Sequence, residues 1–309
     1  MLLRPVRDTE EDAETVRKLA EAAFGASHAL KGDAPGGAAP ADRTAAPTAA
    51  PTAARTAARA ARSREKIRHL VRHDPAGSWL AEDESGQAVG AAQSSLREGT
   101  WGLGLLVVAP GAQGKGVGRA LLQRTLEYGR GCLRGIICCS RHPAAARVYR
   151  QAGFALHPTI RMRGVVDRDR LGPVDGPAVE GSPRDQDLLD SVDRRLRGGA
   201  HGPDHAYLMR HHRLVVADDL TGSGYCYVDA DGKVALLAAT SRRLASRVLR
   251  AALLSGEEGR VVEVHDVTAE QQWAVDVGLA AGLELRSEGF VCFRGMRPPT
   301  PYIPSGAFL

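Results

Sequence analysis

A run of glycines and basic residues between Gln113 and Arg119 has the composition of a phosphate-binding loop. It follows the apolar segment 105–110, which is typical of a strand, and precedes an amphipathic helix predicted over 116–128. Glycine backbones can approach a ligand closely and turn their N–H groups toward it. A helix N-terminus adds free N–H groups and the positive end of its dipole. With the charge of Lys115, the sequence predicts a pyrophosphate cradle.

Two other kinds of phosphate loop fit this segment less well. The Walker A motif needs Ser or Thr after Gly-Lys, whereas Gly116 follows Lys115 here. The dinucleotide-binding motif is G-x-G-x-x-G, whereas Gly114, Gly116 and Gly118 are spaced G-x-G-x-G. A glycine-rich turn before an ordinary helix is the remaining alternative.

The elements that must position this loop follow from hydrophobic periodicity, caps and turn residues. In the first half we predict strands at 2–6, 78–81, 88–96, 101–108, 133–139 and 154–165, and helices after Asp8 or Thr9, at 116–128 and at 143–152. In the second half we predict helices at 185–197, 242–254 and around Trp273, and strands at 213–217, 224–228, 234–238, 260–265 and 290–293.

Because the order of elements repeats, we expect two similar domains. The predicted fold class is α/β with a mixed, mostly antiparallel sheet flanked by helices in each domain. The domains are expected at 1–166 and 184–309, joined by a Pro-, Gly- and Asp-rich linker at 167–183.

An Ala- and Pro-rich stretch at 31–62 interrupts the first domain. It holds 14 Ala, 4 Pro and 4 Thr in 32 residues and no large apolar side chain. Such a segment buries too little surface to offset its ordering entropy. We expect a disordered or weakly helical insertion, with a helix continuing from its end over 57–71.

Composition excludes several classes of protein. The net charge is +5, but 36 of the 41 basic residues are arginine and aromatics make up only 5%, so a nucleic-acid-binding role is not expected. Five cysteines without CxxC spacing argue against a zinc site or a disulfide framework. No apolar stretch approaches about 18 residues and the N-terminus carries acids, so we expect a cytoplasmic protein without membrane association.

Two motifs in the first half together resemble the GNAT family of acyl-CoA-dependent N-acetyltransferases. Gln113, Gly116 and Gly118 match the family's first motif, a strand followed by Gln or Arg, two residues, Gly, any residue, and Gly or Ala. The second motif, a helix with Ala and Tyr that ends in Gly-Phe, is matched by Ala145, Tyr149, Gly153 and Phe154. The resemblance covers residues 1–166.

This resemblance implies an acetyl-CoA site. The strand before the loop would pair through its backbone with the pantetheine arm, at Val107, Val108 and Ala109. The pyrophosphate would lie on Gln113, Gly114, Lys115, Gly116, Val117, Gly118 and Arg119. It implies no metal, because the acceptor amine attacks the thioester directly and a backbone N–H, expected to be that of Val108, stabilises the oxyanion.

The proton donor and acceptor are less evident from the sequence. Tyr149 matches the family's usual general acid, which protonates the departing thiolate; the alternative is a packed helix residue. The strand at 101–108 lacks the acid that many family members use as general base. Glu98, His142, His157 or a chain of waters remain as alternatives. The family's usual Asn before the second helix is replaced by His142.

Other reactive side chains have a structural interpretation. Cys138 and Cys139 are expected to be buried small hydrophobes, although a Cys acyl carrier is conceivable. The cluster His201–His205, followed by His211 and His212, is expected to be a solvated loop, with an edge of the acceptor site and a metal site as lesser alternatives. The apolar end 301–309 is expected to dock onto a domain.

The second half keeps the outline of the fold and lacks both motifs. Arg242 and Arg243 stand where glycines would be due, and Gly278 stands where Tyr would be. It resembles the degenerate partner of tandem GNAT proteins. The expected function is transfer of acetyl from acetyl-CoA to a primary amine of a small molecule or peptide, with a homodimer as one compatible assembly. The alternatives are a mycothiol-synthase-like tandem transferase and a non-catalytic acyl-CoA sensor.

Overall fold

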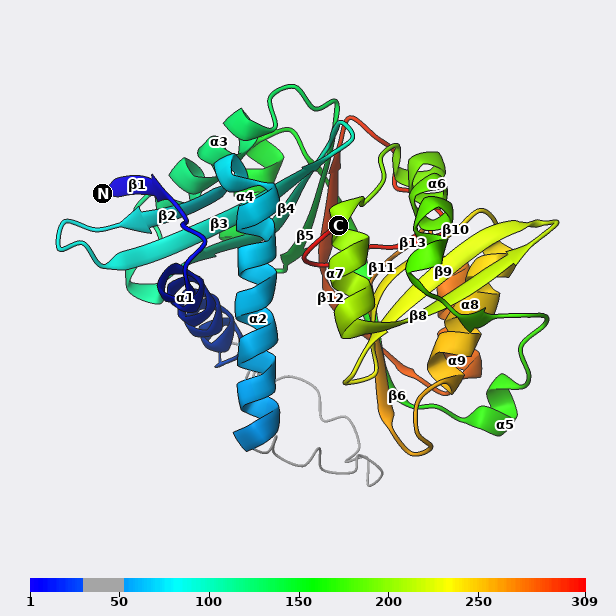
Figure 1. Ribbon diagram of the computed structural model, residues 1–309. Helices are drawn as coiled ribbons and strands as arrows, with labels where there is room; N and C mark the ends of the chain where they lie inside the picture. The colour runs from blue at the N-terminus through cyan, green and yellow to red at the C-terminus, as the bar shows by residue number, and fades with distance from the viewer. Residues whose placement is uncertain (30–52) are drawn as a thin grey trace. The chain divides into compact units, whose positions relative to one another are not determined.

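The computed structural model describes residues 1–29 and 53–309. They form two compact units, one made of Met1–Gln93 and Leu105–Leu126, the other of Ser94–Gly104 and Glu127–Leu309. The part of the predicted insertion at 53–62 is helical, because helix α2 (Ala53–His73) begins there, while 31–52 lies outside the described residues. The elements of each unit are labelled in Figure 1.

The first unit is a small antiparallel sheet covered by helices. β1 pairs with β2 and β2 with β3, both antiparallel. The elements are β1 (Leu2–Pro5), α1 (Glu10–Ala29), α2, β2 (Ser78–Glu82), β3 (Ala88–Arg97), the end of β4 (Thr100–Val108) and most of α3 (Val117–Tyr128), with short 3-10 turns at Pro75–Gly77 and Pro110–Ala112.

The alternation of side chains along these strands sets which helix covers which face. Leu80 and Ala91 pack in one cluster with residues of α1 and α2. Ala81 and Ala92, one residue further along each strand, pack with Val117 and Leu121 of α3. Gly90 lets α3 come this close, because a Cβ there would lie 3.0 Å from side-chain carbons of Val117 and Leu121. The strand pattern therefore fixes the position of the loop before α3.

Helices α1 and α2 are long but highly charged. Ion pairs join them, with Arg68 Nη1 2.7 Å from a Glu10 oxygen and Arg64 Nη1 3.2 Å from a Glu14 oxygen. Within residues 1–29 and 53–309, no helix combines the length and the apolar composition needed to cross a membrane.

The second unit is a larger mixed sheet. Its strands lie in the order β5, β12, β6, β11, β10, β9, β8, β7; the start of β4 pairs with β5, and β13 pairs with β10. The strands are β5 (Arg134–Ser140), β6 (Ala155–Val165), β7 (Val179–Glu180), β8 (His212–Asp219), β9 (Gly222–Asp229), β10 (Lys233–Ala239), β11 (Val261–Thr268), β12 (Glu284–Arg294) and β13 (Tyr302–Ile303). The helices are α4 (Pro143–Gln151), α5 (Arg168–Leu171), α6 (Gln186–Arg197), α7 (Pro203–His211), α8 (Arg242–Leu254) and α9 (Gln272–Ala280), with a 3-10 turn at Pro183–Asp185.

The order of elements repeats, as the sequence predicts. The run β2-β3-β4-α3-β5-α4-β6 is matched by β8-β9-β10-α8-β11-α9-β12. The strands that flank α3 and α8 are parallel in each copy, β4 with β5 and β10 with β11. The pairs β1–β2, β2–β3, β5–β12, β6–β12, β6–β11, β7–β8, β8–β9 and β9–β10 are antiparallel. The expected α/β class with helix-flanked mixed sheets is confirmed.

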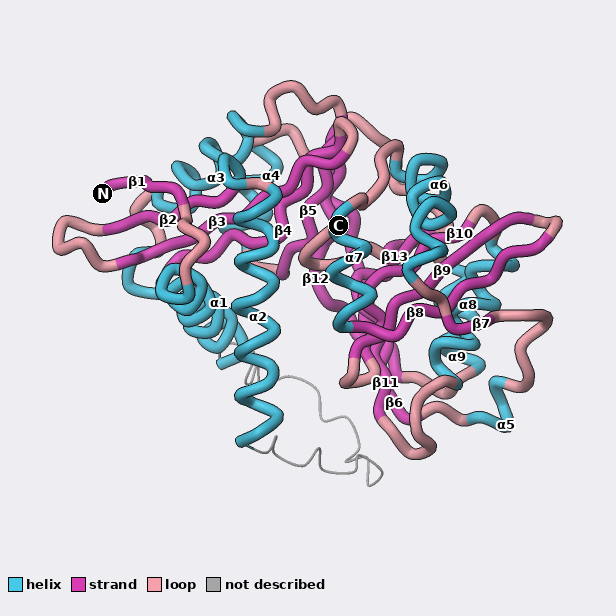
Figure 2. The backbone as a smooth tube through the Cα atoms, viewed as in Figure 1, coloured by secondary structure: helices cyan, strands magenta, loops and turns pink. Residues whose placement is uncertain are grey.

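The last strand of each copy pairs with a strand of the other copy. β6 pairs with β11, from Val261–Val165 to Thr268–Thr159 (Figure 2), and β12 pairs with β5, from Gly289–Ser140 to Arg294–Gly135. The sequence does not predict this exchange, because the apolar pattern of a strand does not specify which strand it will pair with. The boundary near residue 166 therefore stays a prediction.

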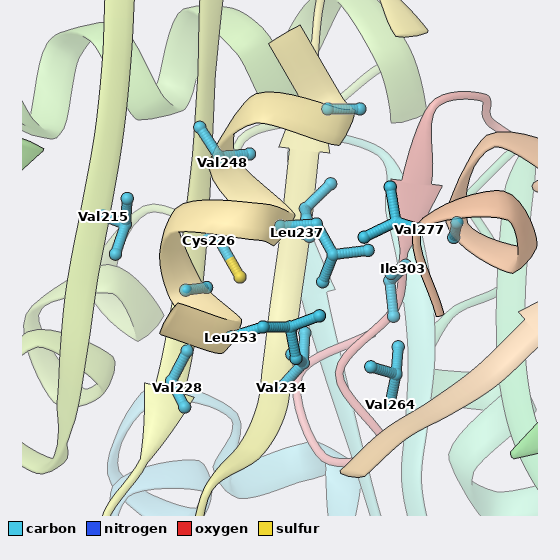
Figure 3. Packing of buried hydrophobic residues seen from close by; sticks show 14 of the residues in the cluster. Val215, Cys226, Val228, Val234, Leu237, Val248, Leu253, Val264, Val277 and Ile303 are labelled. Carbon is cyan, nitrogen blue, oxygen red and sulfur yellow. The ribbon is translucent and has the colours of Figure 1, made fainter. Parts of the chain in front are cut away.

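The main core of the second unit lies under α8 and α9. Cys226 and Val228 of β9 face this core, together with Leu237, Val248 and Ile303 (Figure 3). In Figure 1, α6 and α7 cover the opposite face of β8–β10.

The C-terminal residues dock within the second unit, which confirms the expectation for 301–309. Ile303 pairs with Leu237 of β10 and is fully buried. Leu309 is also fully buried and packs with Ile136 and Phe293. Gly102 makes room for it, since a Cβ there would lie 2.8 Å from Leu309 Cδ1.

Ile303→Ala should lower the free energy of unfolding by about 2–5 kcal/mol, because it leaves a cavity in a packed core. Leu279→Ala is the matched control, because Leu279 is 49% exposed, and should change it by less than about 0.5 kcal/mol. Urea unfolding measures both. Equal effects of the two substitutions would contradict a docked tail.

Candidate active site

The predicted cradle is an open loop between β4 and α3. Gln113 to Gly116 are exposed, and Gly114 and Gly116 have φ values of +78° and +84°. A Cβ on either glycine would meet no atom within 4 Å. Backbone conformation, and not crowding, therefore calls for glycine at both positions. Exposed N–H groups with space around them are what an anion needs.

The charge at the start of α3 is positive. Its first turn contains no acidic residue, and Lys115 and Arg119 flank it with exposed side chains. The positive end of the helix dipole is therefore not offset by a carboxylate within the helix. This arrangement favours a bound phosphate group.

Some backbone groups at the end of β4 already take part in hydrogen bonds. The Ala109 N–H donates to the Val89 carbonyl at 2.9 Å, and the Gln113 side-chain amide donates to the Val108 carbonyl at 3.1 Å. Val107 is buried. The parallel ladder between β4 and β5 ends at Leu103–Ile137, although both strands continue. Of the three residues predicted to meet a pantetheine arm, Ala109 has its N–H engaged by the Val89 carbonyl.

Tyr149 lies on α4 in the second unit and is only 4% exposed. Burial raises the pKa of its hydroxyl above the usual range, and the nearby Cys139 and Cys292 thiols add to this. Gly153, with φ +85°, ends the helix, and the Phe154 N–H donates to the Tyr149 carbonyl at 3.1 Å. The second motif thus places Tyr149 with a protonated hydroxyl, the form a proton donor requires.

The sequence profile of the acetyltransferase (GNAT) family matches residues 47–154, which hold the loop and Tyr149. Residues 47–154 form a GNAT-family domain. No curated protein sequence matches the chain.

Solved structures share the fold over nearly the whole chain. A proposed acetyltransferase from Pyrococcus horikoshii superposes with a TM-score of 0.71 at 18% identity, covering 99% of this chain and 95% of that one. A GCN5-related N-acetyltransferase from Sphaerobacter thermophilus gives 0.56 at 16% identity, covering 99% and 98%. A tandem GNAT protein from the clavulanic acid biosynthesis pathway gives 0.54 at 16% identity, covering 96% and 99%. At these identities the likeness shows the GNAT fold alone.

Two candidate bases of the GNAT domain are engaged elsewhere. Glu98 accepts hydrogen bonds from Arg194 at 2.7 Å and from the Ala200 N–H at 3.0 Å, and the bond from Arg194 holds the pKa of Glu98 below its usual range. His142 is the N-cap of α4, where its Nδ1 accepts from the Ala144 N–H at 3.3 Å. Glu98 is therefore a weak base, and His142 acts as the cap of α4.

The thiols behave as packed side chains. Cys139 and Cys292 lie 3.7 Å apart, sulfur to sulfur, on neighbouring strands, and Cys292 is fully buried. Burial raises the pKa of Cys138 well above that of a free thiol. A protonated thiol is a poor nucleophile, so the structure supports the interpretation as small hydrophobes.

The expectation of a solvated loop at His201–His205 is wrong. Pro203 begins helix α7, with Gly202 at its N-cap and φ +56°, and His201 and His205 are fully buried. Proline is favoured in the first turn of a helix, so the Gly-Pro pair marks a helix start and not a loop.

These histidines share one carboxylate. Asp193 Oδ2 lies 2.6 Å from His201 Nδ1 and 2.9 Å from His205 Nε2. Tyr225 donates to the other oxygen of Asp193, and the Tyr227 hydroxyl pairs with His205 Nδ1 at 3.1 Å. Burial would raise the pKa of Asp193, but the two histidines hold it well below the usual range. The three groups are close enough to bind a metal, yet each already has hydrogen-bond partners, so the cluster by itself indicates a polar core.

In the second copy, side chains of the protein itself occupy the start of α8, which is the counterpart of α3. Ser241 caps the helix by accepting from the Leu244 N–H at 3.3 Å. Asp175, from the linker, lies 3.0 Å from Arg243 and 3.3 Å from Arg247. The chain's own hydroxyl and carboxylate thus occupy groups that a phosphate would need.

The position matching Tyr149 is also filled. Gly278 lies four residues before Gly282, as Tyr149 lies four before Gly153. A Cβ on Gly278 would lie 2.3 Å from the Met162 sulfur. A tyrosine there would have to displace the buried Met162 side chain of β6, which agrees with the degenerate second half that the sequence indicates.

A cavity of about 410 Å³ lies at the start of α6, the end of α7 and β8, lined among others by Glu180, Gln186, Met209, Arg210 and Arg213. It contains none of the predicted site residues.

The sequence analysis did not identify one acid whose pKa is strongly shifted. Asp266, at a bulge of β11, has φ +56°. Burial raises the pKa of Asp266 to about 6, Glu288 adds to this, and Lys233, His265 and a hydrogen bond from Cys138 oppose it. An Asp directly after His265, the last residue of the strand predicted at 260–265, was the available signal.

Asp266→Asn should stabilise the protein at pH 7. A carboxyl whose pKa is higher in the folded state destabilises the fold increasingly as the pH rises from about 4 to about 6. Above pH 6 the folded protein bears the full cost of the ionised Asp266, about 3 kcal/mol for a pKa raised by about two pH units. The neutral amide of Asn removes this cost. Asn also tolerates a positive φ.

Thermal unfolding at pH 4 and pH 7 measures this difference. The gain should be present at pH 7 and shrink toward pH 4. Asp276→Asn, at an exposed position of α9, is the control and should show no such gain. A loss of stability at pH 7 in the Asp266 variant would contradict the raised pKa.

Proposed function

We propose that the protein transfers an acetyl group from acetyl-CoA to a primary amine, with the cofactor held by the loop of its GNAT domain. The observation that supports this most is the exposed loop with two glycines at positive φ, placed before a helix whose first turn has no acid. The GNAT-family match over 47–154 supports the same donor.

Within this proposal the loop binds the pyrophosphate. The N–H groups of Gly114, Gly116, Val117 and Gly118 donate to phosphate oxygens, and Gln113 fixes the end of β4 through its bond to the Val108 carbonyl. Lys115 and Arg119 supply charge. The pantetheine arm pairs with the end of β4 at Val107, Val108 and Ala109, where the Ala109 N–H also donates to the Val89 carbonyl.

The chemistry is direct attack on the thioester. The amine nitrogen bonds to the carbonyl carbon, the Val108 N–H stabilises the oxyanion, and the bond to sulfur then breaks. Tyr149 gives its proton to the leaving thiolate. Its raised pKa keeps this proton available at neutral pH. The acceptor is a small molecule or a peptide.

A second candidate function is an acyl-CoA sensor without catalysis. The burial of Tyr149, which is 4% exposed, favours this alternative.

Gly116→Glu should weaken acetyl-CoA binding about 10- to 100-fold, because a carboxylate at the loop repels the phosphates; tenfold corresponds to about 1.4 kcal/mol. Gly86→Glu is the matched control, since Gly86 also has a positive φ and open space around it. Isothermal titration calorimetry measures both. No binding by the unaltered protein, or equal weakening by both variants, would contradict the cradle.

Tyr149→Phe should reduce the turnover number about 10²- to 10⁴-fold, the usual contribution of a general acid, and leave the acetyl-CoA dissociation constant within about twofold. Thiol release over a panel of small amines and peptides is the assay. Tight binding without turnover on any acceptor would favour the sensor over the enzyme.

A further inference from the structure

The cavity of about 410 Å³ in the second unit lies where β7, α6, α7 and β8 meet, four elements labelled in Figure 2. It is lined by residues 180–183, by Gln186 at the start of α6, by the last turns of α7 and by 212–214 of β8. All of these residues belong to one compact unit, so the geometry of the cavity is set within that unit. Its volume is at the lower end of the range for ligand pockets, about 300–1,000 Å³, which suits a small molecule.

The chain at 180–183 lies close against β8 and leaves the cavity unfilled. The Gly181 N–H donates to the Leu214 carbonyl at 2.9 Å. A Cβ on Gly181 would lie 2.5 Å from the Leu214 side chain, so glycine permits this close approach. Pro183 then begins the 3-10 turn that leads into α6. Because Gly181, Ser182 and Pro183 are all small, this wall of the cavity leaves space beside α7.

Two polar side chains of the lining are held by backbone carbonyls. His212 Nδ1 donates to the Leu208 carbonyl at 3.1 Å, and Arg213 Nη1 donates to the Ser255 carbonyl at 2.6 Å. A guanidinium has five N–H donors, so the bond from Arg213 leaves donors for a ligand. Side chains that are already held lose less conformational freedom when a ligand binds.

The charges of the lining favour an anion. Arg210 at the end of α7 and Arg213 at the start of β8 bring two exposed guanidinium groups to the same cavity, where the lining sets Glu180 against them. A guanidinium recognises a carboxylate through two parallel N–H···O bonds, which fix its orientation as well as its position.

The lining also has an apolar part. Met209 is partly buried, Leu214 is 3% exposed, and both line the cavity together with Ala206. An inorganic anion would contact the arginines and leave this apolar surface in water. An organic acid with a short apolar chain or ring would use both parts of the lining and gain the free energy of burying its apolar surface.

We infer that this cavity binds a small organic carboxylate, with Arg210 and Arg213 on the carboxylate group and Met209 and Leu214 on the apolar part. The inference goes beyond the proposed function and does not depend on it, since none of these residues takes part in the proposed transfer. The second copy, whose helix start is occupied by its own side chains, thereby has a ligand site of another kind.

Hydrocinnamate is the probe, because it joins one carboxylate to a short apolar body. The full chain should bind it with a dissociation constant of about 1 mM or tighter, a range open to ligands of about ten non-hydrogen atoms. Hydrocinnamamide keeps the shape without the charge, and inorganic phosphate keeps a charge without the apolar body. Each should bind at least about tenfold more weakly in isothermal titration calorimetry.

Arg210→Gln and Arg213→Gln should each weaken hydrocinnamate binding about tenfold, because each removes a charge-assisted contact. Arg242→Gln is the matched control, since it removes the same charge from an exposed position of α8 outside the lining. It should leave the affinity within about twofold. Glu180→Gln should strengthen binding about two- to tenfold, because a like charge no longer faces the carboxylate.

Ala206→Phe tests the cavity without changing its charge. The larger side chain should fill the space and abolish hydrocinnamate binding, while the melting temperature of the free protein stays close to that of the unaltered chain, because Ala206 is exposed. A thermal melt of each variant without ligand separates loss of the site from loss of the fold.

Three results would overturn the inference. The first is no hydrocinnamate binding by the folded protein, and the second is equal weakening by Arg242→Gln and the two lining variants. The third is tighter binding of free phenylalanine, whose added ammonium group would pair with Glu180, together with weaker binding in Glu180→Gln. None of these results bears on acetyl-CoA binding, which the Gly116→Glu experiment tests separately.

Discussion

The pairing of β12 with β5 and of β6 with β11 is the interaction on which the second unit depends. It places the last strand of each copy in the sheet of the other. Met162 of β6 thereby enters the core under α8 and α9, and Phe293 of β12 joins Ile136 and Leu309. It also brings His157, Glu270 and Phe293 together from three separate strands or their ends. No one copy could assemble these contacts alone.

The two copies differ at the start of the helix that follows their third strand. In the first, Gly114 and Gly116 leave the start of α3 open. In the second, Ser241 and Asp175 satisfy the start of α8 from within the chain. Met162 fills the place where a tyrosine would lie, and Gly278 is the consequence. The two copies therefore differ in packing as well as in sequence motif.

The sequence predicted what is local. The strand–loop–helix around Gln113, the helix that carries Tyr149 and the repeated order of elements follow from spacing and turn residues, and the structure has them. Contacts between distant segments could not be predicted. Hydrophobic periodicity shows which face of a strand or helix is buried, but not which element packs against that face. The strand exchange, the Asp193 network and the Glu270–His157 pair are of this kind. The α7 helix was missed because Gly202-Pro203 was interpreted as a loop when it marks a helix start.

The central claim is that one of the two copies holds the cofactor. Hydrogen–deuterium exchange with and without acetyl-CoA tests this directly, because it reports on both helix starts in one sample. The account predicts new protection at 113–122 and none at 241–247. Protection at 241–247, or at neither segment under saturating acetyl-CoA, would contradict it.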